Sequence, residues 1–186
     1  EKHTMKRLIV SACLLAFAAV LPAQATKKPP LSPPAQATVT VNGKTITIDY
    51  SSPRVRGREG KIYTKDGLIS HDAHYPVWRA GANAATTLHT AADLTIGDLN
   101  VPAGTYTLFI DISNPDQWVL IVSKATGEWG LSYDSTKDLG RTDMHMGKTR
   151  AMVEDLAWRL TSRKPGHARM SIAWENVRAS VPVIVQ

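Results

Sequence analysis

The sequence is poor in the residues that cross-link small domains. It has one cysteine among 186 residues, which excludes an intrachain disulfide framework and any zinc site built from several thiolates. It also contains no P-loop, no dinucleotide-binding glycine pattern and no long internal repeat. The length suits one domain, and a hydrophobic content of 43% excludes wholesale disorder. The absences therefore leave a single ordinary globular domain.

The longest apolar run is short and lies near the start of the chain, at Leu8–Leu21. Lys6 and Arg7 precede the run, and an A-x-A pattern ending at Ala25 follows it. A basic start, a short apolar stretch and small residues at the end predict a secretory signal peptide. The run is too short for a membrane-spanning helix, which needs about 20 residues. We interpret residues 1–25 as a signal peptide with a short upstream extension, and expect a periplasmic or secreted protein.

Cys13 lies within this predicted signal peptide, so the mature chain is expected to have no cysteine. That expectation agrees with an oxidising compartment, where a free thiol is a liability. Residues 10–13 also resemble a lipidation motif, but only a short apolar segment precedes them. We interpret Cys13 as part of an ordinary signal peptide.

The formal net charge of +6 is compatible with a nucleic-acid partner in magnitude but not in distribution. Basic residues are scattered along the chain, apart from one cluster at Arg54, Arg56, Arg58 and Lys61. Export also argues against nucleic acid. The expected partner is a carbohydrate or an anionic polymer of the cell envelope, and no cofactor is predicted.

The region after the signal peptide divides into two parts. Residues 26–37 are rich in Lys and Pro and predict an extended spacer. From Thr38 apolar residues alternate with polar ones, and Asn42-Gly43 separates two such runs, which predicts a tight β-hairpin. Gly97-Asp98 predicts a second hairpin in the same way. The folded domain is therefore expected to span residues 38–186.

The C-terminal part admits both a helical and a strand interpretation. Residues 152–160 would give an apolar helical stripe, but Leu156, Trp158 and Leu160 also alternate with polar or small residues. Alternation resumes after a turn at residues 164–167, so strands are favoured throughout. Many short strands with frequent turns predict a single-domain, all-β, antiparallel β-sandwich, jelly-roll-like in type.

An ordered set of motifs resembles a known bacterial secreted family, Domain of Unknown Function 2911. The resemblance extends from about Val39 to Val183 and implies a small exported all-β domain without a particular activity. The chain differs from the family pattern before Trp78, where members usually carry a Pro-Tyr-Gly-Lys-type turn and this chain has Ile69–Pro76. The resemblance is carried by segments 52–58, 77–86, 99–109, 127–134 and 174–183.

The best candidate site is the segment from Trp78 to Asn83. Trp78, Arg79 and Asn83 combine an aromatic face, a planar cation and an amide, which together can stack on a sugar and bind its hydroxyl groups. Gly81 would allow a ligand or another backbone to approach closely. In the structural alternative, Trp78 fills the core, Arg79 binds loop carbonyls and Asn83 closes a turn.

Arg58, Trp129 and Tyr133 are also assigned to this candidate binding site. Arg54, Arg56 and Arg58 alternate, so in an extended chain they would share one face, either for an anion or as a charged edge strand. Of these, Arg58 is assigned to the site. Trp129 and Tyr133 lie beside glycines and can form an aromatic wall for a glycan, or anchor their loop to the core.

Two other functions remain open alongside non-catalytic binding. His71, Asp72 and His74 form a weak candidate metal set for an enzyme, and His89 with Asp134 is a candidate acid–base pair. The third alternative is a structural or protein-interaction module whose sheet edge pairs with a partner. No nucleophile motif or close pair of glutamates stands out, so no catalytic residue is assigned.

Overall fold

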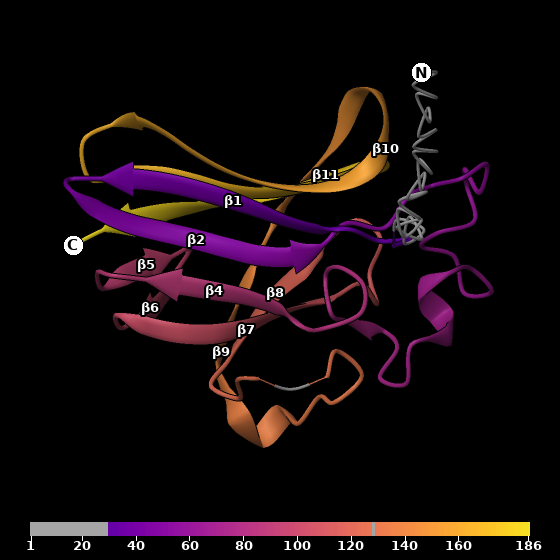
Figure 1. The fold of residues 1–186 in the computed structure, drawn as a ribbon, viewed down its shortest axis with the longest axis horizontal. Helices are drawn as coiled ribbons and strands as arrows, with labels where there is room; N and C mark the ends of the chain where they lie inside the picture. The colour runs from indigo at the N-terminus through magenta and orange to yellow at the C-terminus, as the bar shows by residue number, and fades with distance from the viewer. Residues whose placement is uncertain (1–29, 128) are drawn as a thin grey trace, which may run out of the picture.

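The computed structural model describes residues 30–127 and 129–186 and has no α-helix among them. Two antiparallel sheets pack together, as Figure 1 shows, so the predicted antiparallel β-sandwich is confirmed. The predicted signal peptide lies outside the described residues. No helix among the described residues is long and apolar enough to cross a membrane.

The larger sheet follows the chain in a mostly sequential order, β1-β2-β4-β7-β8-β9, with the short β3 beside the end of β7. The β1–β2 and β7–β8 hairpins have short connections, as antiparallel pairing allows, whereas a long segment that contains β3 joins β2 to β4. Its strands are β1 (Pro34–Val41), β2 (Lys44–Ser51), β3 (Val77–Trp78), β4 (Thr86–Thr90), β7 (Gly104–Asp111), β8 (Val119–Ser123) and β9 (Asp138–Asp143).

The smaller sheet has the order β10-β11-β5-β6 and is dominated by one long hairpin. The hairpin strands β10 and β11 are much longer than the other two, and their pairing is interrupted by register shifts between Lys148 and Val153 and between Val153 and Ala157. Its strands are β5 (Leu94–Ile96), β6 (Leu99–Val101), β10 (His145–Lys164) and β11 (His167–Val185).

Both predicted hairpins are present. Asn42 and Gly43 have φ angles of 52° and 75° and join β1 to β2, because a two-residue turn of this hand needs residues that tolerate positive φ. Gly97 has a φ of 63° between β5 and β6. In both cases local turn chemistry determines the pairing register.

The predicted domain start is four residues too late. β1 begins at Pro34, so residues 34–37 belong to the sheet rather than to a spacer. A proline is tolerated here because β1 is the edge strand of its sheet and Pro34 is its first residue. The remainder of β1 alternates as expected, with Val41 buried.

The C-terminal region is a strand, as favoured from the sequence. Leu156, Trp158 and Leu160 are buried while Arg159 is exposed, which is the period-two pattern of a strand with one face on the core. These residues pair with β11, where Met170 and Ile172 are buried by the same alternation.

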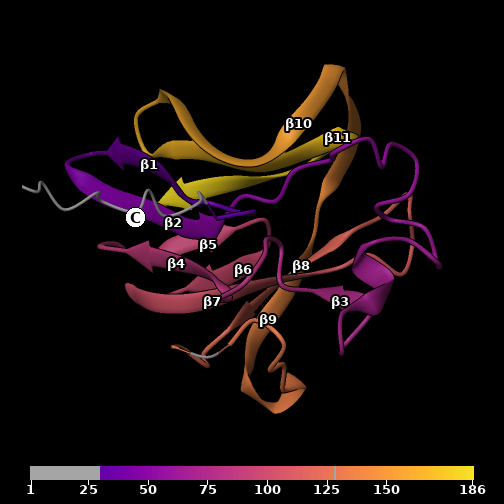
Figure 2. The same cartoon turned by 45° about the vertical axis from the view of Figure 1, so that its right-hand side comes forward.

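Four aromatic side chains fill the core beneath the loop end of the sandwich. Trp78 and Trp174 stack with ring centroids 6.1 Å apart and an interplanar angle of 19°. The Tyr63 ring contacts both of these indoles edge-on, and its centroid lies 5.0 Å from that of Trp118. The loop containing the 3₁₀ helix η1 (Ile69–His71) lies at this end of the molecule (Figure 2). This cluster provides a rigid base for the surface above it.

Candidate functional site

The loop after β3 is positioned by Trp78. Its indole is only 2% exposed, and Nε1 donates a hydrogen bond to the Gly81 carbonyl at 3.2 Å. Ala80 and Asn83 have φ angles of 54° and 58°, so the chain turns sharply between them. A Cβ on Gly81 would lie 2.9 Å from Thr86 Oγ1, so the glycine allows close packing against the protein's own chain.

Arg79 is held by a two-point contact with Asp72. Arg79 Nε and Nη2 donate to the two carboxylate oxygens of Asp72 at 3.2 Å and 2.6 Å, and the side chains are 12% and 16% exposed. Arg79 Nη1 also donates to the Asn83 carbonyl at 3.1 Å. Since a guanidinium has five N–H groups, two of those on Arg79 remain for other partners.

Asn83 connects this loop to the start of the described chain. Its Nδ2 donates to the Ser32 carbonyl at 3.2 Å, and Arg56 Nη2 donates to the Leu31 carbonyl at 3.1 Å. Among the described residues no hydrogen bond to Asn83 Oδ1 is formed, so this acceptor and the second amide hydrogen are available. The segment before β1 therefore forms one wall of the site.

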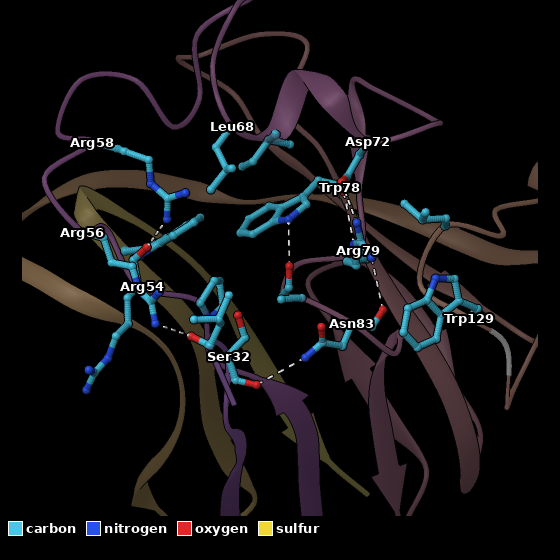
Figure 3. A pocket seen from close by; sticks show the side chains of 17 residues that line it. Ser32, Arg54, Arg56, Arg58, Leu68, Asp72, Trp78, Arg79, Asn83 and Trp129 are labelled. Atoms are coloured by element: carbon cyan, nitrogen blue, oxygen red, sulfur yellow. Dashed lines mark hydrogen bonds and ion pairs between the residues drawn. The ribbon is translucent and has the colours of Figure 1, made fainter. Parts of the chain in front are cut away.

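These residues surround a cavity of about 350 Å³, which we call the Trp78 pocket. Figure 3 shows Arg54, Arg56 and Arg58 on one side, Trp129 on the other and the Trp78 ring between them. Trp174, which is 1% exposed, also lines it. A volume of this size is within the range of small-molecule sites. Five of the six predicted binding residues line it: Arg58, Trp78, Arg79, Asn83 and Trp129.

The three alternating arginines do not form an edge strand, which corrects that interpretation. Arg56 and Gly57 have positive φ, so the segment is a turn rather than extended chain. Arg54 pairs with Asp155 at 2.5 Å, and Arg58 donates to the carbonyls of Val55 and Arg54. The arginines thus converge on one rim of the pocket while much of their donor capacity is used within the protein.

The two aromatic residues of the predicted wall have different positions. Trp129 is 59% exposed and lines the Trp78 pocket. Tyr133 is outside the lining and packs against Phe109, with a centroid distance of 4.9 Å. Its hydroxyl donates to Asp138 Oδ2 at 2.9 Å. Burial, followed by this hydrogen bond, raises the pKa of Tyr133 to about 12. Tyr133 is therefore an anchor for its loop, and the shared aromatic wall is wrong.

The weak metal set is not assembled as a ligand cluster. Asp72 binds Arg79 with both oxygens, and the His74 ring packs edge-on to Tyr133 at 5.8 Å. Among residues 30–127 and 129–186, no group of three or more His, Cys, Asp or Glu side chains is placed to hold a metal ion.

His89 and Asp134 are also separate. His89 Nδ1 lies 2.9 Å from Thr105 Oγ1, and Nε2 lies 3.3 Å from Asp49 Oδ2. Asp134 caps the 3₁₀ helix η2 (Ser135–Lys137). Hydrogen bonds from the Thr136 hydroxyl, and then from the Thr136 backbone N–H, lower the pKa of Asp134. The candidate acid–base pair is therefore not formed.

The sequence interpretation missed several contributors to the pocket, among them Leu31, Ser32 and Trp174. Leu31 and Ser32 fall in the predicted spacer, and Trp174 was assigned to the core alone. The alternation around Trp174 correctly indicates burial, but it cannot reveal that one edge of a buried ring borders a cavity. No local signal brings Ser32 to Asn83, because their contact spans 51 residues.

The fold and this pocket define the class as a small antiparallel β-sandwich with an aromatic-floored surface cavity. Comparison with protein families matches residues 32–183 to the family described as Protein of unknown function (DUF2911), and the chain belongs to it. This agrees with the resemblance noted in the sequence. Searches of curated proteins and of solved structures find no significant match.

Proposed function

We propose that this protein is an exported, non-catalytic binding module that takes a carbohydrate in the Trp78 pocket. The observation that carries this proposal is Trp129, a large aromatic side chain that is 59% exposed at the rim of a concave site. Single exposed apolar residues are common on protein surfaces. An exposed indole beside a cavity with free polar groups is a more specific combination, because a sugar ring has an apolar face and a hydroxyl edge.

The polar groups around the pocket suit hydroxyl recognition. Arg79 retains two N–H donors, and Asn83 retains an acceptor and a donor within reach of the cavity. Their positions are fixed by Asp72 and Ser32, so little conformational entropy is lost when a ligand binds. The carboxylate of Asp72 also neutralises Arg79, which favours a polar ligand over a small anion at this side of the pocket.

The proposal requires no chemical step. The candidate metal residues and the candidate acid–base pair are dispersed or bonded to other protein groups, as described above. Binding alone is the activity that the available groups support.

A glycan array tests the proposal with the chain lacking residues 1–25 and two matched variants. We expect one class of glycan to bind, and Trp129→Ala to weaken its binding roughly tenfold, a loss at the lower end of the about 1–3 kcal/mol that stacking on an aromatic side chain contributes for a nucleic-acid base. Ile184→Ala removes another exposed apolar side chain, distant from the pocket lining, and should bind like the parent. An array without a binding glycan, or equal binding by all three proteins, would refute the proposal.

A further inference from the structure

A second cavity lies on the long β10–β11 hairpin and is strongly basic. Its volume is about 470 Å³, and the charged residues lining it are Arg163, Lys164, Arg169 and Arg178, together with His167. No aspartate or glutamate lines it. We call it the basic pocket. It shares no lining residue with the Trp78 pocket.

The strand pattern places these side chains on one face. Thr161 lies opposite Arg169 in the β10–β11 ladder, and Arg163 is two residues beyond Thr161. Since side chains alternate along a strand, Arg169 and Ser171 also share a face. The buried neighbours Met170 and Ile172 occupy the opposite, core-facing side.

Curvature of β11 brings the second half of the strand against this face. The two ends of β11 approach each other, since Val185 N–H donates to the Gly166 carbonyl at 2.8 Å. Glu175, with a φ of 57°, lies where the ladder with β10 shifts register. Figure 2 shows the matching strong curvature of β10. Arg178 and Ser180 thereby face residues that precede them by about ten positions in the same strand.

A direct contact confirms this closure within the described chain. Arg169 Nη1 donates to Ser180 Oγ at 3.3 Å. The Ser180 residue is only 7% exposed, and its own hydroxyl hydrogen has no acceptor among the described residues. The contact orients one guanidinium and leaves a hydroxyl donor beside it.

The four cations are not neutralised by neighbouring carboxylates. The ion pairs among residues 30–127 and 129–186 involve Arg54, Arg79, His89 and Arg141, and none of the basic-pocket residues. Like charges held close together repel one another, and a bound anion relieves that repulsion. A concave wall lowers the local dielectric constant and strengthens the attraction.

We propose that the basic pocket binds a tetrahedral oxyanion, a phosphate or sulfate group. Guanidinium groups bind such oxygens with paired N–H donors. The positive charge of three arginines and one lysine is also more than a single carboxylate would neutralise. The available donors of Ser180 and Thr161 add neutral hydrogen bonds. The group can arrive as a small soluble ester or as the headgroup of an anionic lipid.

Titration calorimetry with inorganic phosphate, sulfate and a sugar phosphate tests the site on the chain lacking residues 1–25. We expect saturable binding that weakens with added sodium chloride, because salt screens charge–charge attraction. Arg169→Gln and Arg178→Gln should each weaken binding roughly tenfold, since each removes a charged hydrogen-bond donor. Arg150→Gln makes the same charge change at an exposed position of β10 that does not line the pocket, and should bind like the parent.

A vesicle experiment identifies the source of the group. Phosphatidylcholine vesicles with and without phosphatidic acid are sedimented with the parent and the three variants. Binding of soluble esters alone indicates a small-molecule site, and Arg169-dependent binding of phosphatidic acid vesicles alone indicates a headgroup site. The proposal is overturned when neither probe binds, or when Arg150→Gln reduces binding as much as Arg169→Gln and Arg178→Gln. These assays leave Trp129 unchanged, so they are independent of the carbohydrate proposal.

Discussion

At the scale of single residues, the Trp78 pocket depends on how Arg79 is held. Its guanidinium is largely buried and is compensated by one carboxylate, Asp72. A partly buried charge that loses its partner retains its desolvation cost, whereas an exposed pair contributes little. The structure offers a direct comparison, because Arg54 and Asp155 form an exposed pair at nearly the same distance.

Asp72→Ala is therefore expected to lower the free energy of unfolding by about 2–3 kcal/mol, since it leaves the Arg79 charge unpaired. Asp155→Ala should cost less than about 1 kcal/mol, because its side chain is 48% exposed. Urea unfolding of both variants measures the difference. Equal losses would show that the buried pair is not the element holding the loop.

Tyr133 gives a pH-dependent prediction. Its pKa is raised from 10.0 to about 12, chiefly by burial and then by Asp138. Between these values the unfolded chain has lost the phenolic proton while the folded chain retains it, so this contribution to stability is complete below pH 10 and falls as the pH rises towards 12.

Urea unfolding of the parent and of Tyr133→Phe at about pH 9 and about pH 11 checks this sign. The parent should lose more stability between the two values than the variant does. A spectrophotometric titration of the parent should also show a phenolate ionisation at about pH 12, and this ionisation should be absent in Tyr133→Phe. An unchanged pH dependence in the variant would contradict the assignment.

At the scale of elements, the pocket is assembled by loops that approach at backbone distance. Gly130 follows Trp129. The backbone of Trp129 forms an isolated antiparallel β-bridge with Ala84, which joins the two sides of the site. A Cβ at Gly130 would lie 2.5 Å from the Asn83 carbonyl oxygen and 2.6 Å from Arg79 Cδ. Both neighbours are pocket residues, so this glycine sets the spacing between the loops.

Gly130→Ala is expected to displace Arg79 or Asn83 and to weaken glycan binding more than it lowers stability, because the loops lie at the surface. Gly147→Ala is the matched control: its nearest atom, on the Arg178 side chain, would be 3.5 Å away. Binding measured on the array glycan, together with urea unfolding, separates the two effects. Unaltered binding by Gly130→Ala would mean that the loop spacing is not critical.

The elements themselves were largely predictable because their signals are local. The Asn42-Gly43 turn and the alternation of Leu156, Trp158 and Leu160 each specify structure within a few residues. The curvature of β11 and the turn at Arg56 were not predictable. They depend on contacts such as Gly166 with Val185 and on the Arg56 backbone N–H with Glu154, which are distant in sequence.

The candidate site was predictable to a similar extent. Trp78, Arg79 and Asn83 are neighbours in sequence, so their combination was visible, and Trp129 was identified as a candidate aromatic wall. Tyr133 was misplaced because its sequence context does not reveal that Asp138 and Phe109 surround it. Ser32 was missed because the predicted spacer concealed the start of β1.

At the scale of the whole molecule, the sandwich carries two cavities of different chemistry. The Trp78 pocket has an aromatic floor and an arginine that Asp72 neutralises, whereas the basic pocket is lined by cations without lining carboxylates. The two share no lining residue, although Trp174 of β11 borders the Trp78 pocket. We therefore expect their ligands to bind independently.

The central claim is that a carbohydrate occupies the Trp78 pocket, and the indole N–H signals of the tryptophans test it directly. In a nitrogen-15-labelled protein titrated with the glycan selected on the array, the Trp129 signal should shift most, followed by Trp78 and Trp174, which also line the pocket. Trp118 and Trp158 lie outside the lining and should change least. No indole shift at saturating glycan, or a shift confined to Trp118 and Trp158, would contradict the account.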